Sequence, residues 1–125
     1  MLIAYWIVAG FLALAYLVAG GVKLFRSKAA LEAQGMRWVS GASAALVKLV
    51  ALLEILGALG LILPPLLNIV PAVAVFAAIG LILVQAVAIG VHLSMHDVRG
   101  MPVNILLLAA AIAASWLGAT VFVVG

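Results

Sequence analysis

The sequence predicts an all-α membrane protein with four transmembrane helices in an antiparallel bundle and a short interfacial helix between the first two. Hydrophobic residues make up 70% of the 125 residues and charged residues 7%, which is more apolar surface than a soluble domain of this size could bury. The apolar residues form four runs, each long enough to cross about 30 Å of hydrocarbon as a helix. Because no internal repeat or linker divides the chain, we expect one domain, residues 1–125.

Each apolar run gives one expected spanning helix. The four helices are expected over residues 2–25, 44–63, 72–94 and 102–124. No basic residue precedes the first run, which is also longer than a signal-peptide core, so we expect it to stay in the membrane. An uncharged connection from Pro64 to Pro71 joins the second and third helices.

The connection between the first two spanning helices contains the expected interfacial helix. Ser27 can cap this helix, which would run through Glu32 and end at Gly35. Residues suited to anchor the chain at the membrane interface follow at Met36, Trp38 and Val39.

Basic residues predict how the chain is oriented in the membrane. Arg26, Lys28 and Arg37 lie in the first connection and Arg99 lies in the third, whereas the proline connection has no charge. Because cytoplasmic loops are enriched in Lys and Arg, we expect the first and third connections to face the cytoplasm and both termini to face outside. We interpret the formal net charge of +3 as a topology signal and expect no nucleic-acid partner.

Polar side chains recur at two depths inside the expected helices. About one turn from the cytoplasmic ends lie Lys48, His92 and Asn104, with Lys23 shallower still. Near the midplane, roughly 13 Å deep by the helical rise, lie Tyr16, Glu54 and Gln85. Polar groups that face lipid have no partners, so we expect these side chains to converge inside the bundle.

Several of these residues also have a purely structural interpretation. Glu54 with Gln85 or Tyr16 can form an interhelical hydrogen bond, worth about 0.6 kcal/mol in membrane averages. Lys48 is shallow enough to extend to the interface, and its pairing with Glu54 is not required. His92 and His96 lie one turn apart, but no second helix offers another strong ligand, so we interpret them as an interfacial pair and expect no metal site.

The sequence excludes thiolate metal sites and lacks the common catalytic motifs. The chain has no cysteine, which rules out thiolate metal sites and iron–sulfur ligation by its own residues. It contains no glycine-rich phosphate loop, no HExxH-type helix and no plausible serine, histidine and acid combination. We therefore assign no catalytic residue and do not expect an autonomous enzyme.

Three stretches resemble the DoxX-like family of small four-helix membrane proteins. They are VKLVALLEILGALGLILP at residues 47–64, GVHLSMHD at 90–97 and PVNILLLAAA at 102–111. The resemblance carries over the positions Lys48, Glu54, His92 and Asn104. The sequence departs from the family pattern at Ala51, where a glycine often stands, and a bulkier residue there would narrow a pocket.

The resemblance also implies a cellular setting. Named members of the family include a membrane subunit linked to thiosulfate oxidation with quinone as acceptor, and a mycobacterial membrane protein associated with superoxide dismutase and a sulfurtransferase. By resemblance we expect a multi-pass protein of the bacterial inner membrane, surrounded by membrane lipids. Quinone is the implied cofactor, and a soluble redox enzyme on the cytoplasmic loops is the implied partner.

The residues leave three classes of function open. The one we favour is a binding module for an amphipathic quinone or lipid, and its candidate ligand-binding residues are Glu54, Gln85, Tyr16, Lys48, His92 and Asn104. The second is an accessory subunit that delivers electrons from a soluble enzyme to quinone. The third is a structural scaffold or a transporter component, and a transporter of 125 residues would require a homo-oligomer.

Overall fold

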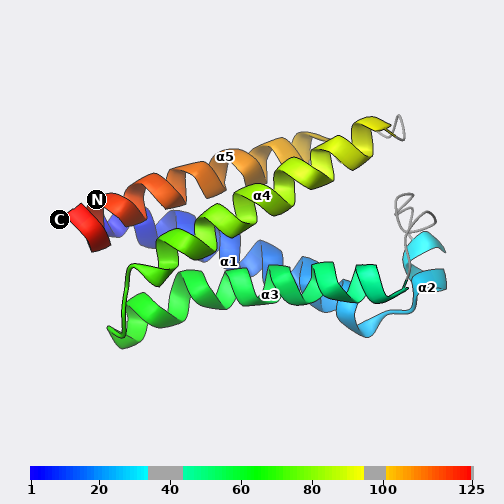
Figure 1. The fold of residues 1–125 in the computed structure, drawn as a ribbon, viewed down its shortest axis with the longest axis horizontal. Helices are drawn as coiled ribbons and strands as arrows, with labels where there is room; N and C mark the ends of the chain where they lie inside the picture. Colours follow the sequence, from blue (N-terminus) through cyan, green and yellow to red (C-terminus); the bar gives the residue numbers. More distant parts are fainter. Residues whose placement is uncertain (34–43, 95–100, 125) are drawn as a thin grey trace.

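The computed structural model describes residues 1–33, 44–94 and 101–124, and every regular element in these ranges is a helix. The elements, shown in Figure 1, are α1 (Leu2–Phe25), α2 (Lys28–Ala33), α3 (Ala44–Leu67), α4 (Val73–Ser94), α5 (Met101–Gly118) and the π-helix Ala119–Val124. Within the described ranges, four helices are long and apolar enough to cross a membrane. The predicted all-α fold with four spanning helices is thus confirmed.

The four long helices form a ring in the order α1, α3, α4, α5, in which each helix packs against the next. Both termini and the connection between α3 and α4 lie at one end of the bundle, and α2 lies at the other (Figure 1). Neighbouring helices in the ring run antiparallel to each other (Figure 1). The helices α3 and α4 diverge from their connection toward the α2 end (Figure 1).

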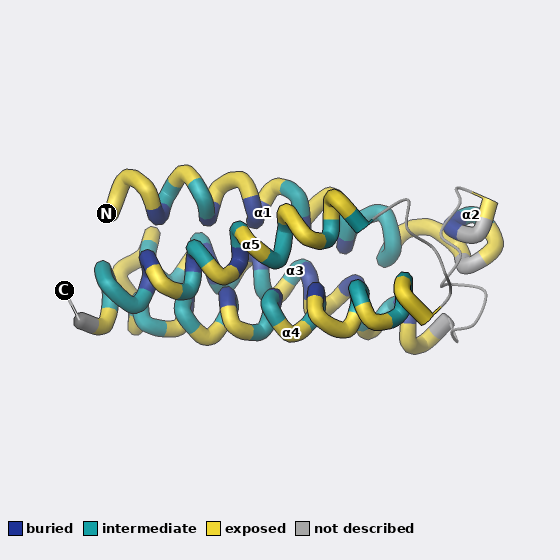
Figure 2. Tube along the Cα trace, turned by 90° about the horizontal axis from the view of Figure 1, so that it is seen from above, coloured by how far each residue is buried: buried dark blue, intermediate teal, exposed yellow. Residues whose placement is uncertain are grey.

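The spacing of buried residues explains how each helix packs. In α1 the buried residues Tyr5, Ala9, Leu12 and Tyr16 recur every three or four positions and so share one face. This face turns toward the other helices, and the exposed residues of α1 point outward (Figure 2). The outward face is apolar, as a lipid-facing surface must be, and Ile7 is 68% exposed there.

Glycine allows α1 and α3 to approach each other closely. A Cβ atom at Gly20 would lie 2.8 Å from Ile55 Cγ1 and 2.9 Å from the backbone oxygen of Ala51. Gly57 similarly brings α3 onto α4, because a Cβ there would lie 2.6 Å from Leu81 Cδ2. Small residues at such crossings are the usual means of tight helix packing in membranes.

The second spanning helix is longer than the sequence predicted. We expected it to end at residue 63, whereas α3 continues through Pro64 and Pro65 to Leu67. Pro65 has no N–H, so the carbonyl oxygen of Leu61 lacks its intrahelical donor. The hydroxyl of Tyr5 donates to this oxygen at 2.6 Å and takes the place of that donor.

The end of α3 has a regular C-terminal cap. Asn68 adopts a positive φ of 54°, which asparagine tolerates better than most residues. Its N–H donates to the carbonyl of Pro65 at 3.3 Å, and the N–H of Ile69 donates to the carbonyl of Pro64 at 3.0 Å. This pair of bonds is a Schellman motif, which satisfies two of the carbonyls left open at the helix end.

The short helix α2 begins as the sequence predicted. The hydroxyl of Ser27 accepts a hydrogen bond from the N–H of Ala30 at 3.1 Å, so Ser27 is the N-cap. The helix covers Lys28–Ala33. The predicted stop at Gly35 and the predicted interfacial anchors at 36, 38 and 39 lie outside the described residues.

The last spanning segment changes from an α-helix to a π-helix before its end. We expected one helix over residues 102–124, whereas α5 ends at Gly118 and the chain continues as a π-helix over Ala119–Val124. At the transition, the hydroxyl of Thr120 donates to the carbonyl oxygen of Trp116 at 2.9 Å. Threonine bonds of this kind compete with the regular ladder and distort helices.

Candidate functional site

A groove of about 750 Å³ runs between α3 and α4. Its rim consists of large apolar side chains that are exposed on the outside of the bundle: Leu46, Leu53 and Leu56 from α3, and Phe76, Leu83 and Val87 from α4. Because this outside surface faces hydrocarbon when the four helices span a bilayer, the groove is open to lipid.

Five polar side chains line the interior of this groove, and all four spanning helices contribute. They are Lys23 from α1, Glu54 from α3, Gln85 and His92 from α4, and Asn104 from α5. The most deeply buried are Glu54 and Gln85, which are only 2% and 4% exposed. Since the other lining residues are glycine, alanine and larger apolar residues, the groove has a polar floor and apolar walls.

Glu54 forms an ion pair with Lys23. The Nζ atom of Lys23 lies 2.5 Å from Oε1 of Glu54, and the two side chains are only 14% and 3% exposed. The sequence had placed Lys23 in a shallower layer and had considered Gln85, Tyr16 and Lys48 as neighbours of Glu54. A usable signal was present, because Lys23 lies seven residues after Tyr16 on the same face of α1.

Lys48 bonds to the C-terminal end of α1. Its ammonium group donates to the carbonyl oxygens of Lys23 at 2.8 Å, Leu24 at 2.7 Å and Arg26 at 2.7 Å. These oxygens lie at the C-terminal end of α1, where carbonyls lack intrahelical donors. These three bonds cap α1 and hold the segment that carries Lys23. Lys48 itself does not line the groove.

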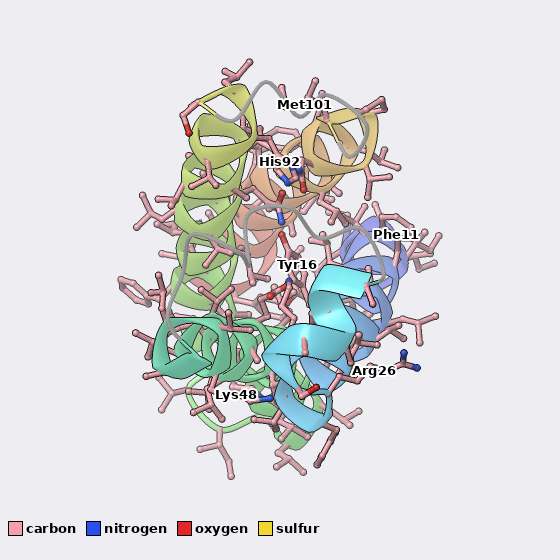
Figure 3. All side chains as sticks on the ribbon, turned by 90° about the vertical axis from the view of Figure 1, so that its right-hand side faces the viewer. Phe11, Tyr16, Arg26, Lys48, His92 and Met101 are labelled. Carbon is pink, nitrogen blue, oxygen red and sulfur yellow. The ribbon has the colours of Figure 1, made fainter. Side chains whose placement is uncertain are left out.

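Tyr16 lies at the centre of the bundle, behind the groove. Figure 3 looks along the bundle from the α2 end and shows Tyr16 and His92 pointing into the space between the helices, while Phe11 points outward. The Tyr16 hydroxyl lies within reach of the Gln85 side chain and close to the Glu54 carboxylate. Within the described part of the chain it nevertheless has no direct hydrogen bond of ordinary geometry.

Two amide groups in the groove also have unused hydrogen-bonding capacity. The Oε1 atom of Gln85 and the Nδ2 atom of Asn104 are buried and have no hydrogen-bond partner among the described residues. Most buried polar atoms in proteins are paired, so each exception calls for an explanation. Both residues also line the groove, which has a volume of about 750 Å³.

His92 belongs to no cluster of metal ligands among the described residues. There, no three His, Cys, Asp or Glu side chains come together as ligands. His92 lines the groove near the end of α4, and His96 lies outside the described residues.

The fold and the groove together define a class: a small four-helix integral membrane protein with a polar cluster inside the bundle that opens laterally to lipid. The chain belongs to the DoxX-like family, whose pattern it matches over residues 7–114. No curated protein and no solved structure matches it. The match covers α3 and α4 and most of α1 and α5, so it includes all five polar residues of the groove.

Proposed function

We propose that this protein binds one small amphipathic molecule of the bilayer, a quinone or a lipid, in the groove between α3 and α4. The observation that carries the proposal is that Gln85 and Asn104, which each leave a buried amide atom unpaired among the described residues, line a groove whose rim is apolar and exposed. Such an arrangement suits a ligand that enters sideways from the membrane, with its headgroup inside and its tail along the rim.

The energetics of polar groups in hydrocarbon support this proposal. Each unsatisfied polar group there costs several kcal/mol, since no water is available to bond it. Gln85 and Asn104 each leave one amide atom unpaired among the described residues. A bound headgroup that bonds both atoms would remove that cost, whereas a saturated lipid tail would not.

The dimensions of the groove agree with a small-molecule ligand. Its volume of about 750 Å³ lies within the range of roughly 300–1,000 Å³ that is usual for ligand pockets. Near the α3–α4 connection, Gly80 lines the groove, and a Cβ atom there would meet nothing within 4 Å. The space beside Gly80 is therefore open to the tail of a ligand.

Mass spectrometry of co-purifying small molecules tests this proposal. The protein would be extracted with its native lipids, next to Gln85→Leu, Glu54→Gln and the control Ser115→Ala, a residue that does not line the groove. We expect one defined quinone or lipid to be enriched on the parent and on Ser115→Ala and reduced on the two groove variants. Identical bulk-lipid profiles on all four proteins would contradict the proposal.

We further propose that the end of the bundle that carries α2 faces the cytoplasm. The exposed residue Arg26 lies at this end, next to α2, whereas the connection between α3 and α4 at the other end carries no charged residue. The enrichment of basic residues in cytoplasmic loops supports this orientation. The polar part of the groove, near Lys23 and His92, would then lie toward the cytoplasmic leaflet.

A further inference from the structure

We propose that the groove selects an electrically neutral headgroup that both donates and accepts hydrogen bonds, and that it discriminates against anionic and cationic amphiphiles. This inference rests on the proposed function and narrows the class of ligand. It follows from how charge and hydrogen-bonding capacity are divided among the polar residues that line the groove.

The charges in the groove already compensate each other. Among its lining residues, the lysine Lys23 and the carboxylate Glu54 form the ion pair described above, so these two charges offset each other. An anionic headgroup that bound Lys23 would have to separate it from Glu54 and leave a buried carboxylate without its cation. A cationic headgroup that bound Glu54 would strand Lys23 in the same way. Uncompensated buried charges are strongly unfavourable, so either exchange is disfavoured.

The remaining capacity of the groove is neutral. The unpaired Oε1 of Gln85 accepts hydrogen bonds, and the unpaired Nδ2 of Asn104 donates them. A ligand hydroxyl can donate to the first, and a ligand carbonyl or hydroxyl oxygen can accept from the second. Every side-chain amide carries one accepting and one donating atom, so exchanging the oxygen and nitrogen of either residue preserves the requirement for a neutral partner.

The positions of these amides set the direction of the ligand. Gln85 and His92 are seven residues apart on one face of α4, which places them about 10 Å apart along the helix. Asn104 is near the start of α5 and His92 near the end of α4, so both lie at the α2 end of the groove. The apolar half lies toward the α3–α4 connection and is lined by Gly60, Phe76 and Gly80. An extended polar headgroup would occupy the first half and an alkyl chain the second.

Three amphiphiles with the same alkyl length test this selectivity: monopalmitoylglycerol, which is neutral with hydroxyls and a carbonyl, palmitate, which is anionic, and hexadecylamine, which is cationic. Each is titrated onto the full chain in one non-ionic detergent, and binding is measured by native mass spectrometry. Binding in the groove is defined as the part lost in Gly80→Phe, where the new ring fills the open space. The matched control is Gly90→Phe, because Gly90 is exposed on the same helix, does not line the groove and also has nothing within 4 Å of an added Cβ.

We expect monopalmitoylglycerol to bind in the groove about tenfold more tightly than either charged amphiphile, a difference of about 1.4 kcal/mol. Groove binding of palmitate or hexadecylamine that equals or exceeds that of the neutral compound would overturn the selectivity but leave the proposed function intact. If none of the three shows binding that Gly80→Phe removes, the proposed function falls together with the selectivity.

Two variants identify the residues responsible. Glu54→Gln leaves the Lys23 cation without its partner, so the groove of this variant should bind palmitate relatively more tightly than the parent does. Gln85→Leu removes one neutral hydrogen-bonding partner. It should weaken the binding of monopalmitoylglycerol about three- to tenfold without favouring either charged compound. An unchanged order of affinities in a folded Glu54→Gln protein would overturn the role of charge compensation. If that variant does not fold, the titration of the parent still decides the question.

Discussion

At the scale of single residues, the ion pair between Lys23 and Glu54 explains how two charges persist inside an apolar bundle. Both side chains are nearly excluded from the surface, and they come from neighbouring helices, α1 and α3. A lone charge at this depth would be costly, whereas a pair compensates itself. The pair therefore couples the packing of α1 and α3 to the electrostatics of the groove.

We predict that Lys23→Met destabilises the protein more than the double variant Lys23→Met/Glu54→Leu does. The single change leaves a buried carboxylate without its cation, at a cost on the order of 3 kcal/mol, and the double change leaves no charge at all. Unfolding of the purified variants in detergent measures both effects. The control is Arg26→Met, because the side chain of Arg26 is exposed and should contribute little. A double variant no more stable than the single one would show that the pair is not what keeps Glu54 buried.

The sequence predicted which polar residues lie close together better than it predicted how they pair. The spacing of the polar residues, together with the family resemblance, singled out Glu54, Gln85, His92 and Asn104, and all four line one groove. The partner of Glu54 could not be predicted, because several cations and amides lie within reach of it by helical depth alone. Whether a lysine side chain reaches a carboxylate or a helix end depends on how α1 and α3 cross, which no local pattern contains. The role of these residues in ligand binding stays a prediction.

At the scale of helices, the two prolines of α3 show how a side chain of one helix can supply a hydrogen bond that the backbone of another helix lacks. Pro64 and Pro65 remove two N–H groups from the helix, yet α3 continues to Leu67. The hydroxyl of Tyr5 on α1 donates to the carbonyl of Leu61 that Pro65 leaves open. The sequence predicted an end at residue 63 because a proline pair usually disrupts a helix, and the compensating donor lies 56 residues away.

We predict that Tyr5→Phe destabilises the protein by about 1–3 kcal/mol, because the Leu61 carbonyl then lacks a donor in an apolar environment. In a Pro65→Ala background the restored backbone N–H can bond this carbonyl, so the same Tyr5→Phe change should cost much less there. A double-mutant cycle on unfolding free energies measures the difference. Equal costs of Tyr5→Phe in the two backgrounds would contradict this account of the continuous helix.

At the scale of the whole molecule, the ring of four helices places its two ends on opposite sides of the membrane. Because the chain has no cysteine, single cysteines can be introduced without further changes. We predict that Arg26→Cys resists a membrane-impermeant thiol reagent in intact cells and that Ile69→Cys, at a position 63% exposed, reacts with it. Labelling of both variants after the membrane is opened is the control. The reverse pattern in intact cells would invert the orientation.

The ring also determines where a ligand can enter. Gly57 holds α3 close to α4, while the divergence of the two helices toward the α2 end accompanies the lipid-facing groove (Figure 1). The family match covers the residues of this groove. Composition and the four apolar runs predicted the bundle, but only the packing of the helices shows that the polar residues line one groove between α3 and α4.

The most direct test of the central claim, that the groove holds a small molecule from the bilayer, is native mass spectrometry of the intact chain released from its native lipids, with Gly80→Phe and Gly90→Phe beside it. Both changes add the same ring to α4, but only the first fills the groove. We predict one bound molecule of defined mass on the parent and on Gly90→Phe, and none on Gly80→Phe. The same adducts on all three proteins would contradict the claim.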